Sequence, residues 1–234
     1  MITTILFDLD GTLLPMDQDK FVKSYIGRMA RKLAPHVNDP ELLTAGLWKG
    51  TGAMVKNVGT QTNEEVFWSV FNAVLGKDCR EDEPLFMDYY RNEFQLVAQD
   101  CGFNLRASRA IAEIKEKGCH VVLATNPLFP AIATLSRVRW AGLNPEDFDL
   151  ITTYENSRHC KPNPDYYRDI LATLNLNPEN CVMVGNDVQE DMVAETLGMK
   201  VFLLTDNLIN RTGEDISRYP HGSFGELMIF IQEL

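Results

Sequence analysis

The 234-residue chain has few basic residues, few cysteines and no long apolar run. Its 22 lysines and arginines are outnumbered by 33 aspartates and glutamates, and a net charge of −11 argues against nucleic acid as the main partner, because phosphate backbones are bound by basic surfaces. The five cysteines include no close Cys-x-x-Cys pair, which favours a reducing, cytoplasmic location. No run of apolar residues approaches a membrane span, so no membrane partner is expected. The oligomeric state leaves no trace in the sequence.

Short apolar runs indicate a buried parallel sheet. The chain is 45% hydrophobic and 24% charged, which is typical of a globular protein. The runs are rich in β-branched residues and apolar at consecutive positions, as in parallel strands covered on both faces. Helical patterns alternate with them and predict a doubly wound, Rossmann-like α/β core. We expect strands at 2–7, 120–125, 148–153 (the weakest), 181–185 and 200–204, and helices at 107–118, 129–143, 164–176 and 189–199.

Residues 16–103 break this alternation. Their apolar residues recur at helical spacing and no strand pattern is present. We therefore predict an all-α cap domain at 16–103, inserted into an α/β core made of 1–15 and 104–234. Ligands of open α/β sheets bind beyond the carboxyl ends of the strands, and a cap that leaves the chain just after the first strand would lie over that end.

Two carboxylates stand at the end of the first predicted strand. The stretch ILFDLDGTLLP places Asp8 and Asp10 one residue apart after an apolar run. Like charges held together in a partly dehydrated site repel, so a cation or a reaction is expected to use them. A carboxylate can act as a nucleophile toward phosphorus, and a second acid nearby can move the required protons.

Three further groups are expected at the same edge of the sheet. Thr125 and Asn126 end the second long strand, Lys161 precedes a helix, and Asp187 and Asp191 follow the strand at 181–185. Three or more hard oxygen ligands suit Mg²⁺. A hydroxyl, a backbone amide and a lysine can bind the charge of a transferring phosphoryl group.

These residues resemble the four motifs of the haloacid dehalogenase-like hydrolases. The matching stretches are DLDGT after an N-terminal strand, Thr125 at the end of VVLAT, Lys161 before a proline, and GNDVQED. They occur in the family's order and span 1–15 and about 104–205. The inserted helical region resembles the cap that many members carry, including the phosphoglycolate phosphatase-like group.

The resemblance implies a role for each position. Asp8 would be the nucleophile that becomes an aspartyl-phosphate, and Asp10 the general acid and base. Thr125 and Lys161 would hold phosphoryl oxygens, and we add Asn126 to this group. The metal ligands would be Asp8, Asp10 (through its backbone carbonyl) and Asp187, with Mg²⁺ as cofactor.

The last motif departs from the commonest form of the family. Many members have Gly-Asp where this chain has Gly185-Asn186-Asp187. One alignment gives Asp187 the ligand position and lets Asp191 orient a metal-bound water or a ligand. Another puts the amide of Asn186 in the ligand position. We favour Asp187, because a carboxylate is the stronger ligand for Mg²⁺.

The function expected from this pattern is a Mg²⁺-dependent phosphatase that acts on a small phosphorylated metabolite. A sugar-phosphate mutase of the same superfamily shares the motifs and is the nearest alternative. A dehalogenase is disfavoured, because such relatives need no Mg²⁺ and usually lack the second acid. From a different class, a phospho-accepting or non-catalytic regulatory protein also remains open.

Overall fold

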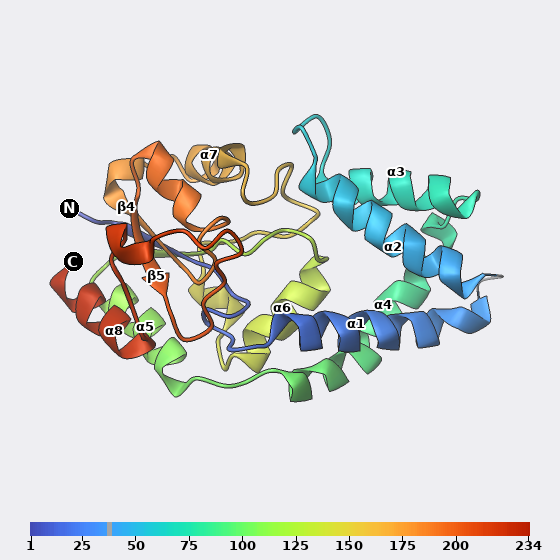
Figure 1. Cartoon of the computed structure of the whole chain (residues 1–234), viewed down its shortest axis with the longest axis horizontal. Coiled ribbons are helices and arrows are strands. Elements are labelled where there is room, and N and C mark those ends of the chain that lie inside the picture. Colours follow the sequence, from blue (N-terminus) through green and yellow to red (C-terminus); the bar gives the residue numbers. More distant parts are fainter. Residues whose placement is uncertain (37–38) are drawn as a thin grey trace.

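The structure, a computed structural model, describes residues 1–36 and 39–234 and has two visibly different parts. Figure 1 shows a sheet with flanking helices at one end and a group of helices at the other. Both chain termini lie at the sheet end, far from the helical group. None of the helices in the described residues combines the length and apolar character needed to cross a membrane.

The described part of the chain contains one parallel sheet in the order β3-β2-β1-β4-β5-β6. The central strand is β1, and the chain winds outward from it in both directions, so the sheet is doubly wound as predicted. The confirmed fold class therefore brings the carboxyl ends of β1, β2 and β4 to one edge. The strands are β1 (Thr4–Phe7), β2 (His120–Leu123), β3 (Leu150–Ile151), β4 (Cys181–Gly185), β5 (Lys200–Leu204) and β6 (His221–Gly222).

Helices cover both faces of the sheet, which explains why the strands are apolar at consecutive positions. Along β1, Ile5 and Phe7 pack in a core that also contains residues of α5, α6 and α8. Leu6 points to the other face and packs with residues of α7. These helices are α5 (Leu105–Glu116), α6 (Ala131–Trp140), α7 (Pro164–Thr173) and α8 (Phe224–Glu233).

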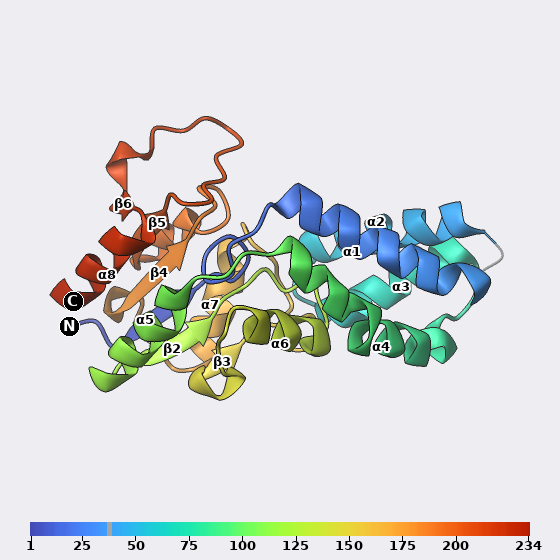
Figure 2. The same cartoon turned by 90° about the horizontal axis from the view of Figure 1, so that it is seen from below.

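The described residues between 16 and 103 are mainly helical (Figure 2). Local signals begin these helices, since the side chains of Asp17, Asp39 and Thr62 each accept a hydrogen bond from a backbone amide of the first turn. The second and third helices pack closely, with Gly46 and Gly50 against aromatic rings. The helices are α1 (Gln18–Leu33), α2 (Pro40–Val55), α3 (Asn63–Leu75) and α4 (Glu83–Arg91), followed by 3-10 turns over Glu93–Asp100.

The two segments that join this helical region to the sheet lie side by side. Met16 and Cys101 form an antiparallel bridge, and the amide of Gly102 donates to the carbonyl of Pro15 at 2.6 Å. The region therefore leaves and re-enters the core at one place.

One predicted helix is wrong. Residues 189–199 form only 3-10 turns over Met192–Leu197. The amides of Gln189 and Glu190 donate to the side chain of Asp187, an arrangement that can cap a helix, but only 3-10 turns follow. The short strand β6 and the helix α8 were not predicted.

Candidate active site

A tight loop after β1 presents Asp8 and Asp10. The amide of Asp8 donates to the carbonyl of Val184 in β4, and the amide of Leu14 closes the loop on the carbonyl of Leu9. Gly11 has a φ of +88°, and a Cβ there would meet the side chain of Asn186 at 2.3 Å. The glycine of DLDGT is thus required by both its backbone and its close neighbour.

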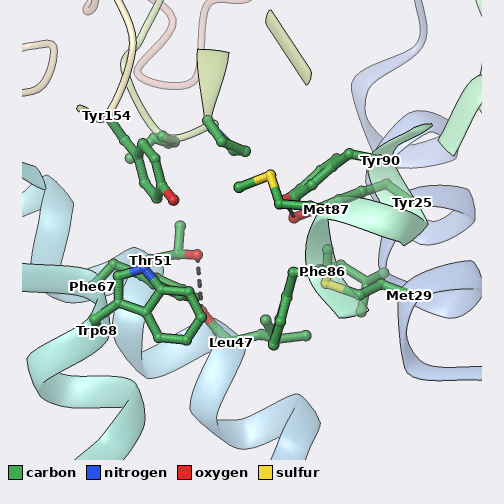
Figure 3. Close-up of a pocket in the computed structure, with 13 residues that line it drawn as sticks. Tyr25, Met29, Leu47, Thr51, Phe67, Trp68, Phe86, Met87, Tyr90 and Tyr154 are labelled. Carbon is green, nitrogen blue, oxygen red and sulfur yellow. Dashed lines mark hydrogen bonds between the residues drawn. The ribbon is translucent and has the colours of Figure 1, made fainter. Parts of the chain in front are cut away.

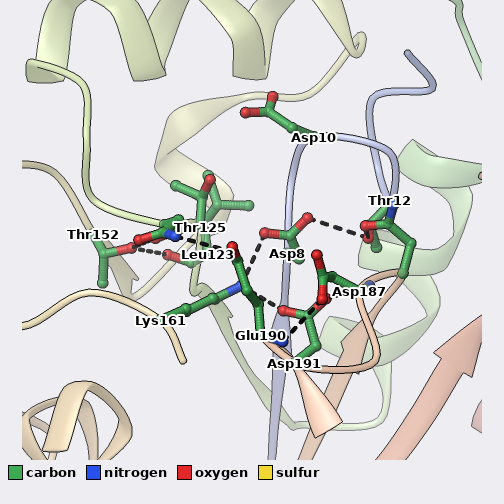
Figure 4. A network of polar contacts seen from close by, with 12 residues as sticks. Asp8, Asp10, Thr12, Leu123, Thr125, Thr152, Lys161, Asp187, Glu190 and Asp191 are labelled. Carbon is green, nitrogen blue, oxygen red and sulfur yellow. Dashed lines mark hydrogen bonds and ion pairs between the residues drawn. The ribbon is translucent and has the colours of Figure 1, made fainter. Parts of the chain in front are cut away.

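Asp8 is buried against a lysine from another loop. Its Oδ1 accepts a hydrogen bond from Lys161 Nζ at 2.9 Å, and its Oδ2 accepts a long one from the Thr12 hydroxyl at 3.3 Å. Lys161 is 1% exposed and also donates to Asp191 at 2.6 Å (Figure 4). Burial works against the charge on Lys161, but Asp191 and Asp8 outweigh it and hold the pKa of the lysine well above its ordinary value. Lys161 is therefore a permanent cation beside Asp8.

Asp191 lies beneath this pair. Burial raises the pKa of its carboxyl, the Lys161 charge opposes that rise, and the Asp8 charge adds to it. Its Oδ2 accepts the backbone amide of Asp187, and a Cβ on Gly185 would meet Asp191 Oδ2 at 2.0 Å. The glycine that ends β4 thus gives Asp191 the space to reach Lys161.

Asp10 points away from the Asp8–Lys161 pair, as Figure 4 shows. Its Oδ2 is bonded to Arg137 of α6, which has no solvent exposure and lies 4.1 Å from the centre of the Phe129 ring. Its Oδ1 is buried and has no hydrogen-bond partner within the described residues. Burial raises the pKa of Asp10 to about 6, against the opposing effect of Arg137 and with a smaller upward contribution from Asp8.

The loop after β4 brings two side chains toward the site. The amide oxygen of Asn186 accepts a hydrogen bond at 3.0 Å from the Thr12 hydroxyl, which also contacts Asp8. The carboxylate of Asp187 accepts two backbone amides on one oxygen and an ion pair with Arg211 on the other. Both positions that the sequence offered as metal ligands therefore belong to the site.

Thr125 and Asn126 end the segment after β2. Thr125 is 2% exposed, and its carbonyl accepts hydrogen bonds from the hydroxyls of Thr152 and Tyr166. Asn126 donates to Glu190 at 3.0 Å, while its amide oxygen is buried without a partner in the described chain. The three parallel strands thus bring the predicted residues to one edge. Asn126, however, is hydrogen-bonded there to the carboxylate of Glu190, a residue that we had not predicted.

The donor atoms near Asp8 suit a hard divalent cation. The described residues contain no cluster of three or more histidine, cysteine, aspartate or glutamate side chains arranged to hold a metal ion. The available donors near Asp8 are all oxygens: carboxylates, the Asn186 amide and backbone carbonyls. Hard oxygen ligands of this kind fit Mg²⁺ and do not suit softer metals.

Charges in the site remain unbalanced. Five carboxylates face three cations, since the acids include Glu190 and the bases are Lys161, Arg137 and Arg211. A phosphate dianion that enters such a site needs additional positive charge. The chemistry of the residues present is thus compatible with a bound divalent cation.

Sequence reasoning missed Arg137, Arg211 and Glu190. A signal existed for Arg137, which shares a helix face with the buried Ala133 and Ala141, where a charge is unusual. No comparable signal exists for Arg211, which is half exposed and lies in the loop after β5.

Comparisons with known proteins place the chain in a family. The model of the haloacid dehalogenase-like hydrolases matches residues 2–194, so the chain belongs to this family. It is 24% identical over 232 residues to a phosphoglycolate phosphatase from Colwellia psychrerythraea, and the alignment covers 97% of this chain and 96% of that one. It is 25% identical to a glyceraldehyde 3-phosphate phosphatase from Methanothermobacter thermautotrophicus, covering 93% and 92%.

A solved structure agrees on the fold. The crystal structure of a phosphatase of the same family from Thermococcus onnurineus covers 98% of both chains with a TM-score of 0.60 and 17% identity. The predicted family is confirmed, and so is the predicted enzyme class, a hydrolase whose named relatives are phosphatases.

Proposed function

We propose that the chain is a Mg²⁺-dependent phosphatase that hydrolyses a small phosphorylated metabolite through a phosphorylated Asp8. The observation that carries the proposal is the placement of Asp8 against the buried cation of Lys161, with a second carboxyl, Asp10, whose pKa lies near 6. Two carboxyl groups in such different surroundings suit the roles of nucleophile and acid.

In the first step, an Asp8 oxygen forms a bond to phosphorus and the bond to the leaving oxygen breaks. Lys161 and Thr125 hold the phosphoryl oxygens, and Asn126 lies beside them. The unpaired Oδ1 of Asp10 carries a proton that passes to the leaving oxygen. In the second step, water attacks phosphorus, Asp10 takes the proton of the water, and the bond from phosphorus to Asp8 breaks.

Mg²⁺ would be held by the Asp8 carboxylate, the Asp10 backbone carbonyl and Asp187, and when bound it would offset the repulsion between Asp8 and the phosphate dianion. Asn186 is the alternative donor, since it is linked to Asp8 through Thr12. The excess of carboxylates over cations supports this part of the proposal.

We also propose that residues 16–103 act as a lid over the site. Paired linkers at Met16 and Cys101 support a hinge, and Asn63 of α3 reaches the core by donating to the carbonyl of Pro127 at 3.2 Å. Closure would exclude water and restrict the enzyme to small substrates.

Release of inorganic phosphate from p-nitrophenyl phosphate and a panel of phosphometabolites tests the function, with Mg²⁺ and with a chelator. Asp8→Asn should abolish turnover, because an amide is a poor nucleophile. Asp165→Asn is the matched control, since Asp165 is a half-exposed carboxylate of α7 paired with Arg168. Near-wild-type kcat in Asp8→Asn would refute the covalent mechanism. Phosphoryl transfer to a second hydroxyl without phosphate release would indicate a mutase.

A further inference from the structure

Asn63 is a polar residue of the helical region whose side chain is buried against the core. It is the first residue of α3 and has no solvent exposure. Its Nδ2 donates to the carbonyl of Pro127 at 3.2 Å, and it also lies 3.4 Å from the carbonyl oxygen of His159 and 3.3 Å from Cys160 Sγ. One side-chain amide therefore bridges two separate loops of the core, the loop after β2 and the loop before α7.

These two loops carry residues proposed to bind the phosphoryl group. Thr125 stands two positions before Pro127, and Lys161 directly follows Cys160. Residues 152–163, between β3 and α7, form neither an α-helix nor a strand. The position of Lys161 therefore depends on the contacts that its loop makes, because no regular element fixes its backbone.

The backbone at the start of α3 adds two hydrogen bonds to the second loop. The amide of Asn63 donates to the carbonyl of Ser157 at 2.8 Å, and the amide of Glu64 donates to the carbonyl of Tyr154 at 2.9 Å. The first amides of a helix have no partner within that helix. Core carbonyls accept these two amides, so the start of α3 is bound to the loop through specific donors and acceptors.

Apolar packing lies beside these hydrogen bonds. Tyr154 of the loop and Phe67 and Trp68 of α3 face the same small cavity (Figure 3). Cys160 packs with Met54 of α2. Apolar contacts are non-directional, so they hold the two parts together without fixing the orientation of either. The hydrogen bonds supply that orientation.

The Asn63 amide is oriented from the helical side. Its Oδ1 accepts a hydrogen bond at 2.9 Å from Nδ2 of Asn57, which also donates to the carbonyl of Gln61. The amide of Gly59 donates to Asn57 Oδ1. Gly59 has a φ of +87°, and a Cβ there would meet Nε2 of His159 at 2.4 Å. The turn between α2 and α3 thus points the N–H groups of Asn63 at the core.

We infer that Asn63 is a positioning residue for phosphoryl binding, because it ties the loops of Thr125 and Lys161 to each other and to the helical region. The inference rests on the proposed function. Asn63 acts through these two residues and not by contact with the substrate. Without its amide, the carbonyl of Pro127 loses a buried donor, and the loops relieve this loss by shifting. A shift of about 1 Å at a phosphoryl-binding group can cost on the order of 10² in rate.

Inorganic phosphate is the probe for this role, because it has no leaving group that could contact the helical region. Its dissociation constant is measured by isothermal titration calorimetry in the presence of Mg²⁺. Asn63→Ala should weaken phosphate binding by about 10-fold. Asn72→Ala is the control, since the Asn72 amide bonds to Asp78 and Cys79 inside the helical region. This variant should lose stability but not phosphate affinity. Unchanged phosphate affinity in Asn63→Ala, shown by circular dichroism to be folded, would overturn the inference.

A double variant tests whether Asn57 acts through Asn63. The side-chain hydrogen bonds of Asn57 in the described chain lie within residues 57–63. Asn57→Ala should weaken phosphate binding by about 3-fold. The double variant Asn57→Ala/Asn63→Ala should bind phosphate no more weakly than Asn63→Ala alone. Additive losses would contradict the inference.

The wild-type chain offers a test that needs no variant. Coupling between two sites is reciprocal, so bound phosphate must hold α3 on the core by the same factor by which Asn63 strengthens phosphate binding. Saturating phosphate should therefore slow hydrogen exchange at the amides of Asn63 and Glu64 by about 10-fold. The amides of α4 should exchange at an unchanged rate.

The outcomes separate this inference from the function on which it rests. If Asn63→Ala does not fold, the exchange experiment decides, and exchange that bound phosphate does not slow would overturn the inference. A wild-type chain that neither binds phosphate nor releases it from p-nitrophenyl phosphate would refute the proposed function instead.

Discussion

Replacement of Arg137 by methionine should destabilise the protein in a way that grows with pH. The guanidinium is fully buried and bonded to Asp10, and methionine keeps an unbranched apolar stem without the charge. Of the two positive charges that lower the pKa of Asp10, Arg137 has the larger effect. Its loss therefore lets this pKa rise above its present value of about 6.

The magnitude follows from proton linkage. A carboxyl whose pKa is raised by folding reduces stability as the pH rises above the unfolded value, and the loss stops at the folded pKa. In the wild type this loss ends near pH 6 and amounts to about 3 kcal/mol for a rise from 3.8 to about 6. In Arg137→Met it continues to the higher pKa, by about 1.4 kcal/mol per pH unit.

The electrostatic destabilisation of Arg137→Met is therefore close to zero at pH 5, and above pH 6 it grows by about 1.4 kcal/mol per pH unit until the pH reaches the raised pKa of Asp10. The free energy of unfolding also changes by an amount that does not depend on pH. The variant loses the stabilising contact with Phe129, but it no longer buries a guanidinium, which is unfavourable. Only the slope with pH is diagnostic.

Urea unfolding at pH 5, 7 and 8 in metal-free buffer measures this slope. Arg139→Met is the control, because Arg139 is exposed on the same helix. A destabilisation of Arg137→Met that is the same at all three pH values, or that shrinks as the pH rises, would refute the reasoning.

Three further outcomes are expected. Asp10→Asn should lower kcat by about 10²–10⁴, and by more for alkyl phosphates than for p-nitrophenyl phosphate, whose leaving group needs little protonation; equal losses would remove Asp10 from the acid role. Lys161→Met leaves Asp8 and Asp191 buried without their cation and should cost about 3–5 kcal/mol in urea unfolding at pH 8, and less at pH 5, because burial raises the pKa of Asp191 and this carboxyl then binds a proton; an unchanged midpoint at pH 8 would contradict this. Arg211→Gln should tighten Mn²⁺ binding, measured by electron paramagnetic resonance, by about 5-fold, because the half-exposed arginine competes for Asp187; weaker binding, or the same gain in Arg218→Gln, whose arginine pairs with Glu195, would argue against that competition.

Much of the fold was predictable because its signals are local. The strands at 181–185 and 200–204 match β4 and β5 residue for residue, since the part of a strand that is buried on both faces is apolar at consecutive positions, and only the exposed Lys200 at the start of β5 departs from this. The helix predicted at 189–199 failed for a non-local reason. There the amide of Val188 donates to the carbonyl of Ile209, and the side chain of Asp187 is paired with Arg211; both partners come from the loop after β5.

The candidate site divides in the same way. The sequence predicted that several side chains would meet at one edge of the sheet, because parallel strands carry the residues at their carboxyl ends there whatever the details of packing. These residues are Asp8, Asp10, Thr125, Asn126, Lys161 and Asp187, and their roles in binding and catalysis stay predictions. A site built at such an edge places its polar residues just after the apolar run of each strand, and this order can be read in the sequence.

Only the tertiary structure decided how these charges are paired. Arg137, in the middle of an amphipathic helix, reaches Asp10 because α6 packs beside the loop after β1, and Arg211 reaches Asp187 because the loop after β5 lies against the end of β4. The first pair is 127 positions apart in the chain and the second 24, so each pairing depends on where two elements pack, and neither partner's own neighbourhood in the chain encodes it. The sequence by itself therefore determined which groups gather at the edge of the sheet, while their charged partners and their pKa values arise from packing.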